Sequence, residues 1–221
     1  MPPLFNRVGG GRILCEMTEQ ISEQVKSIKR SFRLYMNGAT AASMRQKGVN
    51  YHLNWGVSVM DLRRMADDIG PNYELSIELW KENIRECKIL AAMLMPPEQM
   101  WPDMVEVWME QIPTLEVAES LAFYLLQYLE AAPEMAFRWI ASDRYYHRIC
   151  GYHILARLFS RKEEPDERGI NEYLDQVAVA LTDEQAAVRK AAANSVHWFK
   201  ELGEVYRRLA CHALKTDDNV T

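Results

Sequence analysis

Three groups of basic side chains stand out in this 221-residue sequence, because helical spacing would place each group on one helix face. Arginine and lysine on such a face contact phosphates without reading bases, so the groups predict nucleic-acid binding. The same pattern is also typical of ordinary solvated faces whose charges pair at i,i+4. The groups are Lys26, Lys29, Arg30 and Arg33; Arg144 and Arg148; and Lys190, Asn194 and His197.

The second and third groups are the main candidates for a binding groove. In a solenoid of helix pairs, the second helices of successive pairs line one concave surface. We therefore expect Arg148 and Lys190 to face one groove suited to phosphates, with Arg144 and Asn194 beside them. Tyr145 lies between the two arginines and is the candidate for an aromatic edge in contact with water.

No strong catalytic or metal-binding signature is present. The sequence contains no HExxH, GxSxG, P-loop or GxGxxG motif, and its five histidines never reach metal-ligand spacing. We expect no metal and no cofactor. The four cysteines form no CxxC pair, and three of them, Cys87, Cys150 and Cys211, fall in apolar helical patterns. This usage predicts reduced thiols in a cytoplasmic protein.

Composition bounds the remaining classes. Apolar residues make up 48% and charged residues 26% of the chain, which is ordinary for a globular protein. No stretch approaches the roughly 20 apolar residues that span a bilayer, and residues 1–13 lack a secretory signal pattern, so they are expected to be a mobile tail. The net charge of −5 argues against a surface that is basic throughout, but leaves room for one basic groove.

Apolar residues recur at helical spacing nearly everywhere, which predicts an all-α protein. The expected breaks fall near Lys81–Glu82 and at the Pro96-Pro97 pair, with Pro102 opening a helix and Thr114 capping another. Five of the six tryptophans are expected in the core, namely Trp80, Trp101, Trp108, Trp139 and Trp198. Helices are expected at 14–35, 41–47, 59–68, 73–95 in two pieces, 102–112, 114–128, 133–142, 145–159, before 181, 183–201 and after 203.

A weak internal repeat favours a HEAT-like α-solenoid of stacked antiparallel helix pairs. The stretches that begin at Ile84, His147 and Val188 each place Arg before a small-residue helical core. Arg148 and Arg189 lie 41 residues apart, close to the HEAT period of about 40–47. Because such a pair must stack on its neighbours, one domain over 14–219 is expected.

These stretches resemble the AlkD-like DNA alkylation repair family, the HEAT-like repeat alkylpurine DNA glycosylases. The likeness covers about 46–201. Its first part rests on Gly56-Val57 and Arg63-Arg64, and its second on Trp80, Glu86 and Ala91. Its third is FRWIASDRYYHRICGY from Phe137, in which Arg148 aligns with an arginine of the DNA groove, and VRKAAANSV resembles a late helix facing that groove. The resemblance implies a solenoid that holds duplex DNA, and in active members excision of cationic alkylated purines by one Asp and two Trp.

The sequence departs from that family pattern at the implied catalytic positions. The best alignment puts Glu119 at the Asp, Leu115 at the first Trp and Asn194 at the second, with Trp198 one turn later. Glu carries the same charge as Asp, but its extra methylene moves the carboxylate, and the aromatic faces are mostly missing. The leading hypothesis is therefore a DNA-binding protein of the alkylation-repair type with doubtful base excision. The alternatives are an active alkylpurine glycosylase that uses Glu119 and a protein-interaction scaffold without catalysis.

Overall fold

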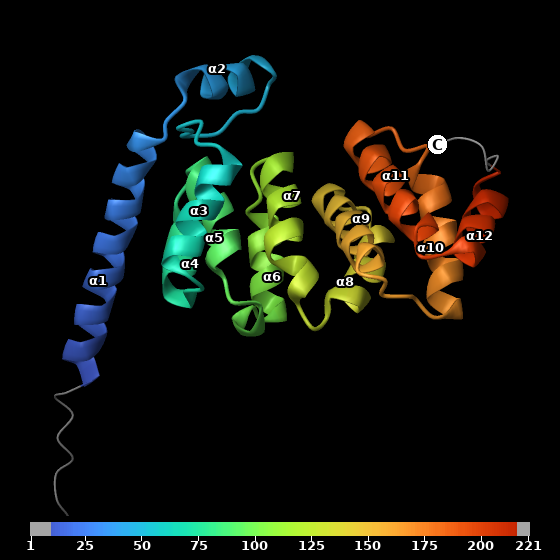
Figure 1. Ribbon diagram of the computed structural model, residues 1–221. Coiled ribbons are helices and arrows are strands. Elements are labelled where there is room, and N and C mark those ends of the chain that lie inside the picture. Colours follow the sequence, from blue (N-terminus) through green and yellow to red (C-terminus); the bar gives the residue numbers. More distant parts are fainter. Residues whose placement is uncertain (1–9, 216–221) are drawn as a thin grey trace, which may run out of the picture. The chain divides into compact units, whose positions relative to one another are not determined.

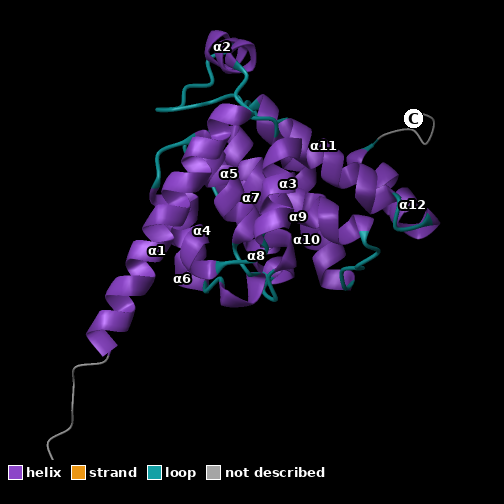
Figure 2. Cartoon of the chain, turned by 60° about the vertical axis from the view of Figure 1, so that its left-hand side comes forward, coloured by secondary structure: helices purple, strands orange, loops and turns teal. Residues whose placement is uncertain are grey.

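The secondary structure is helical throughout the described part of the chain. The computed structural model describes residues 10–215, with side chains from Thr18 onward. Within this part, helices are joined by loops, and the one β feature is an isolated bridge between Leu53 and Ile84 (Figures 1 and 2). The all-α prediction is confirmed.

The chain divides into two compact units, residues 1–96 and 97–221. Within the first unit, α4 packs against both α1 and α5, and α3 packs on α5. A single repeat domain over 14–219 stays a prediction, and residues 1–9 of the expected tail lie outside the described residues. The helices of the first unit are α1 (Gly10–Ser31), η1 (Phe32–Leu34), α2 (Gly38–Gln46), α3 (Val59–Ile69), α4 (Tyr73–Lys81) and α5 (Arg85–Leu94).

In the second unit, α9 is the central helix. It packs against α7, α8 and α11, while α10 and α12 cover α11. An added Cβ at Gly151 on α9 would lie 2.9 Å from Ile140 Cγ2 and 3.0 Å from the Ala136 carbonyl oxygen of α8, so the helix pair needs the small residue. The helices are η2 (Pro97–Gln99), α6 (Pro102–Glu110), α7 (Leu115–Tyr124), η3 (Leu126–Tyr128), α8 (Ala132–Ile140), α9 (Tyr145–Ser160), α10 (Glu167–Ala180), α11 (Ala186–Lys200) and α12 (Glu204–Leu214).

Most predicted boundaries are close to the observed ones. The long 73–95 stretch breaks after Lys81 as expected, Pro102 opens α6, and the Thr114 hydroxyl accepts from the Val117 amide at 3.5 Å. The second helix begins three residues earlier than predicted, because the Asn37 side chain caps it by accepting from the Thr40 amide at 3.0 Å.

The prediction of core tryptophans is wrong at Trp101. Trp80, Trp108 and Trp139 are buried, but Trp101 is 67% exposed at the N-cap position of α6. The residue precedes the helix, so the helical periodicity that placed it in an apolar stripe does not extend to it. This exposed ring lines a cavity whose charged residues are mostly acidic.

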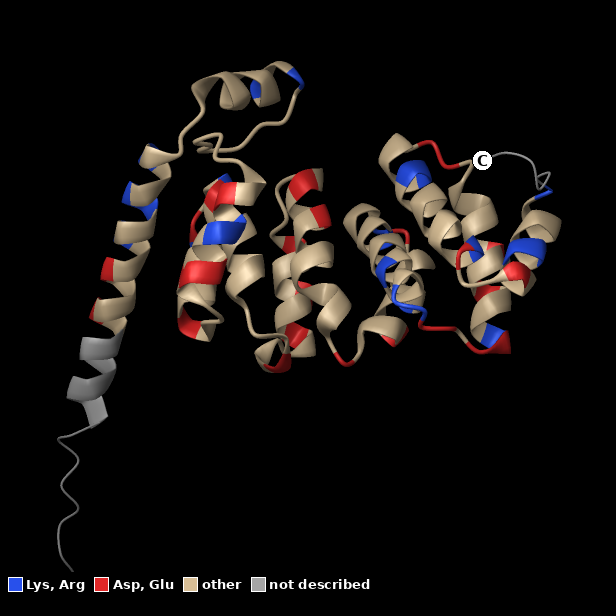
Figure 3. Ribbon diagram, in the orientation of Figure 1, with Lys and Arg blue, Asp and Glu red and all other residues tan. Residues whose placement is uncertain are grey.

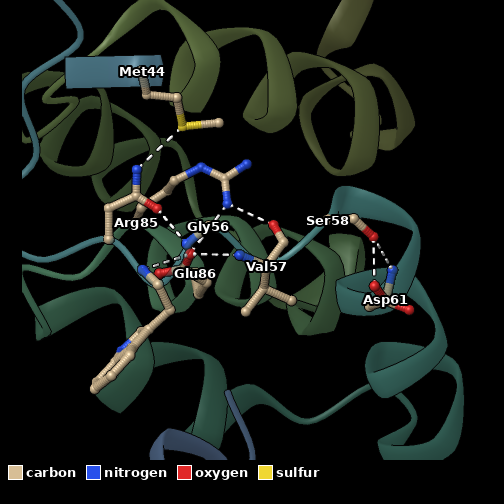
Figure 4. Close-up of polar contacts among 9 residues, drawn as sticks. Met44, Gly56, Val57, Ser58, Asp61, Arg85 and Glu86 are labelled. Atoms are coloured by element: carbon tan, nitrogen blue, oxygen red, sulfur yellow. Dashed lines mark hydrogen bonds and ion pairs between the residues drawn. The ribbon is translucent and has the colours of Figure 1, made fainter. Parts of the chain in front are cut away.

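A buried polar cluster holds the loop before α3 against α5 (Figure 4). The Glu86 Oε1 atom accepts from the backbone amides of Trp55 and Val57 at 3.1 and 3.2 Å, and from Arg85 Nη1 at 3.2 Å. Arg85 Nη1 also donates to the Val57 carbonyl oxygen at 2.8 Å. Both side chains are almost wholly buried, and their mutual contact and the backbone bonds to Glu86 Oε1 and Arg85 Nη1 offset part of the cost of burying the two charges. The Glu86 and Gly56-Val57 motifs of the sequence therefore have a structural role.

Candidate nucleic-acid interface

The predicted site residues lie on α7, α9 and α11 and in the turn before α9. Figure 1 shows α9 between α7 and α11, and Figure 3 shows Lys and Arg on α9 and α11 with acidic residues in the turn before α11. Glu119, Arg144 and Arg148 each contact different residues on a neighbouring helix or turn.

Glu119 on α7 meets His153 on α9. The Glu119 Oε1 and His153 Nε2 atoms are 3.7 Å apart, and the two side chains are 45% and 25% exposed. This distance is too long for a hydrogen bond and suits an ion pair when the imidazole is protonated. The candidate carboxylate is therefore open to solvent and lies beside a basic side chain that the sequence prediction did not include.

The Cys150 thiol, which is buried and lies close to His153 in the sequence of α9, has low reactivity. The Cys150 Sγ atom donates to the Ala118 carbonyl oxygen at 3.4 Å, directly behind the Glu119 turn. Burial raises the pKa of the Cys150 thiol, and the Glu119 charge raises it further. A thiol held in its protonated form is a poor nucleophile, so Cys150 contributes packing to the site.

Arg148 pairs with Asp183 in the turn between α10 and α11. The Arg148 Nη1 and Asp183 Oδ2 atoms are 2.7 Å apart, and the two side chains are 18% and 15% exposed. The Gln185 amide donates to the other Asp183 oxygen at 2.7 Å. That bond, together with the Arg148 guanidinium, lowers the pKa of the Asp183 carboxyl. Arg148 thus positions the start of α11, and its charge is partly neutralised.

Arg148 and the Glu119 contact lie on different sides of α9. His153 follows Arg148 by five residues, which is about 140° around a helix axis. The structure therefore brings Glu119 to His153 and brings Arg148 to Asp183, each through a separate neighbour of α9.

Arg144 is engaged by two carboxylates of α6. It lies 2.9 Å from Glu106 and 3.6 Å from Glu110, and Glu106 also lies 3.3 Å from the His147 Nε2 atom. Burial opposes ionisation of Glu106, but the bonds from His147 and Arg144 outweigh it and lower the pKa of this carboxyl. Burial also lowers the pKa of His147. The charge of Arg144 is therefore opposed by two carboxylates.

The other predicted contacts are open to solvent. Lys190 and Asn194 are exposed and one turn apart on α11, and Tyr145 is 36% exposed at the start of α9. The Tyr145 and Tyr146 ring centroids lie 5.0 Å apart. Lys190 is therefore the predicted cation best placed to meet a phosphate. The proposed contacts stay predictions.

The basic group of α1 has mixed surroundings. Lys26 pairs with Glu23 at 2.7 Å and Lys29 with Glu82 at 3.0 Å, while the Arg33 guanidinium lies 5.6 Å from the centroid of the Trp55 ring. These contacts match the ordinary paired helix face more closely than a phosphate-binding strip.

A cavity of about 670 Å³ beside α6 has the opposite character from a phosphate groove. Glu98, Glu106 and Glu130 face it with Arg138 as the one basic lining residue, so its net charge repels phosphates. Its apolar wall includes Met100, Trp101, Tyr128 and Met135.

Sequence reasoning missed three residues that the structure adds to the α7–α9 face. They are Phe123, His153 and Arg157. Phe123 follows Glu119 by four residues, and Arg157 follows His153 by four, so i,i+4 spacing could have found both pairs. The pairing of the two helices is not visible in the sequence.

The sequence model of a family described as "DNA alkylation repair enzyme" matches residues 28–219. The chain belongs to this family. Among curated proteins, none matches the chain.

One solved structure similar to this member of the DNA alkylation repair family is described as "A new family of proteins related to the HEAT-like repeat DNA glycosylases with affinity for branched DNA structures". Its TM-score is 0.74 at 17% sequence identity, and the match covers 86% of this chain and 82% of that one. This likeness establishes the HEAT-like repeat fold and confirms the predicted fold class.

The described residues also bear on metal binding and on membrane insertion. No group of three His, Cys, Asp or Glu side chains among them is arranged to hold a metal ion. Within the same part of the family member, no helix is long and apolar enough to cross a membrane.

Proposed function

We propose that this protein binds DNA, with a preference for branched over linear duplex DNA and without efficient base excision. The observation that carries the proposal is the DNA alkylation repair family match over 28–219. The HEAT-like neighbour is described as having affinity for branched DNA, which supports branched DNA as the ligand we propose.

The charges around α9 favour a branch over a continuous duplex. Tight sequence-independent binding of a linear duplex needs many unpaired protein cations that contact phosphates along the DNA backbone. Here Arg144 is held by Glu106 and Arg148 by Asp183, while Glu119 is partly exposed on the neighbouring helix. Because these two arginines are paired, we expect a linear duplex to be held weakly, whereas a branch brings phosphates from several arms to the same residues.

The missing aromatic residues argue against base excision. At the positions where the resemblance implies two tryptophans, Leu115 and Asn194 offer no aromatic face to a cationic base. Glu119 has the required charge, but its carboxylate is partly exposed to water and lies 3.7 Å from the His153 imidazole, which offsets that charge whenever the ring is protonated. We therefore propose that the protein binds DNA structures and leaves the glycosidic bond intact.

The test is DNA binding as a function of salt. We expect log Kd to rise linearly with log salt concentration, with a slope that reports the phosphates contacted. Lys190→Glu should weaken binding about tenfold and lower the slope by about 1. The control Lys81→Glu makes the same charge change on an exposed α4 residue and should leave binding nearly unchanged. Absence of binding at low salt, or equal effects of the two variants, would refute the proposal.

A further inference from the structure

We propose that Phe123 and Arg157 form a stacking site for an unpaired nucleotide at a DNA branch, a proposal that rests on the proposed function. Phe123 is the last but one residue of α7, and Arg157 lies in the last turn of α9. The Arg157 guanidinium carbon is 4.9 Å from the centroid of the Phe123 ring.

The Phe123 ring is exposed where an apolar residue would ordinarily be buried. It retains 41% exposure even though Arg157 lies over it and the Tyr124 ring meets it edge-on at 4.9 Å. The neighbouring Leu121, Ala122 and Leu125 are wholly buried, so the core of the unit does not need this ring. An exposed aromatic face is the surface on which unpaired bases stack.

The Arg157 guanidinium is ordered by a neutral partner. Its Nε donates to the Gln127 Oε1 atom at 3.3 Å, and Gln127 is almost fully buried. Among the described residues, no carboxylate forms an ion pair with Arg157, in contrast to Arg144 and Arg148. The charge of Arg157 is therefore preorganised and still available to a phosphate.

A second arginine–aromatic pair is formed by Arg161 and Tyr128. The Arg161 guanidinium carbon lies 5.8 Å from the centroid of the Tyr128 ring, which is 55% exposed. Arg161 Nη2 donates to the Gln127 carbonyl oxygen at 3.2 Å, while its Nε donates to Glu163 at 2.8 Å. Arg161 is thus partly neutralised, and the Phe123–Arg157 pair is the stronger contact.

The pair is positioned to extend the α7–α9 face. Phe123 lies one turn beyond Glu119 on α7, and Arg157 lies one turn beyond His153 on α9. Since Glu119 repels phosphate, the phosphate of a bound nucleotide would lie on the Arg157 side. A base stacked on Phe123 must be unpaired, because a base inside a duplex presents only its edge.

The experiment uses the full chain and a three-way junction with two unpaired bases at the branch, one of them 2-aminopurine. A fully paired junction of the same length is the DNA control. We expect binding of wild-type protein to quench 2-aminopurine fluorescence, and Phe123→Ala to abolish the quenching and weaken binding about 5- to 100-fold. Phe123→Trp should preserve both, and Arg157→Gln should weaken binding while reducing the quenching in part.

Two controls separate stacking from general effects. Trp101→Ala removes an exposed aromatic ring in the acidic cavity, and it should behave as wild type. On the fully paired junction, Phe123→Ala should bind as wild type does, and its thermal melting should match.

The stacking site would be overturned if Phe123→Ala quenched 2-aminopurine as strongly as wild type, or if it lost the same affinity on both junctions. In either case, binding of the junctions by wild type would leave the proposed function standing. Failure of wild type to bind any DNA would overturn both.

Discussion

Among the described glycines, Gly56 has the least room for a side chain. Its φ of +69° lies in the left-handed region, and a Cβ at this position would lie 2.2 Å from the Asn37 carbonyl oxygen. Gly48 has a similar φ of +80° but open space around it, so the two glycines separate backbone strain from steric overlap.

Gly56→Ala should therefore destabilise the protein more than Gly48→Ala. The backbone conformation alone costs about 1–2 kcal/mol for an alanine, which we expect for Gly48→Ala. Gly56→Ala must also displace the start of α2, so its loss of unfolding free energy should be at least about 3 kcal/mol. Urea unfolding of both variants measures the difference. Equal losses would show that the loop before α3 yields without cost.

Lys88 makes stability depend on alkaline pH. The residue is 7% exposed, with Nζ 4.2 Å from the centroid of the Trp80 ring, and burial lowers its pKa to about 8. Below pH 8 the folded protein carries the buried charge, and the full cost of burying it lowers the free energy of unfolding. Between pH 8 and about 10.4 the folded chain has lost this proton while the unfolded chain still binds it, so the destabilisation becomes smaller as the pH rises.

Lys88→Met should accordingly be more stable than wild type at pH 7, and its advantage should shrink as pH rises to 9. The expected change approaches about 1.4 kcal/mol per pH unit once the pH exceeds 8. Urea unfolding at the two pH values gives the comparison. An advantage that is constant with pH would mean that Lys88 reaches water in the folded protein.

Glu119 should not support base excision. Loss of one preorganised electrostatic group costs about 100- to 1000-fold in rate, and each missing cation–π partner costs about 0.5–2 kcal/mol more. We expect release of N7-methylguanine from a methylated duplex to stay near the spontaneous rate for wild type and for Glu119→Gln. Single-turnover measurements decide it. Rapid release by wild type that collapses in Glu119→Gln would make Glu119 a catalytic residue.

At the scale of the elements, the decisive contact is the one between α9 and the turn before α11. Asp183 ties up Arg148 and also accepts from the Gln185 amide. Asn at this position keeps an oxygen for that amide but loses the charge.

Asp183→Asn should therefore release Arg148 and raise the affinity for DNA about two- to fivefold. Asp175→Asn, which makes the same charge change on the exposed side of α10, is the matched control and should have a smaller effect. Titration of a fluorescent junction by the three proteins measures the change. An equal rise for both variants would indicate general electrostatics in place of a released arginine.

Helices and their ends were predictable because local patterns determine them. The break after Lys81, the proline at 102 and the Thr114 cap each follow from propensity and capping within one turn. The site was less predictable, because its contacts join helices that are far apart in the sequence. Asp183 for Arg148 and His153 for Glu119 are 35 and 34 positions away, and neither pair leaves a signal in the spacing.

At the scale of the whole molecule, the chain is acidic and yet belongs to a DNA alkylation repair family. The net charge of −5 is compatible with DNA binding through a few cations that form no ion pair with a carboxylate in the described part of the chain, such as Lys190 on α11 and Arg157 on α9. The family match shows the broad class, and the likeness to a solved structure shows the fold. The paired arginines support the proposed preference for branched DNA.

The most direct test of this account compares a four-way junction with a linear duplex of the same length and base composition. Wild-type protein at about 0.1 M salt should bind the junction at least about tenfold more tightly, a difference of about 1.4 kcal/mol. Fluorescence anisotropy with each DNA as competitor of the other gives the ratio without assuming a site size. Equal or weaker binding of the junction, or no binding of either DNA, would contradict the account.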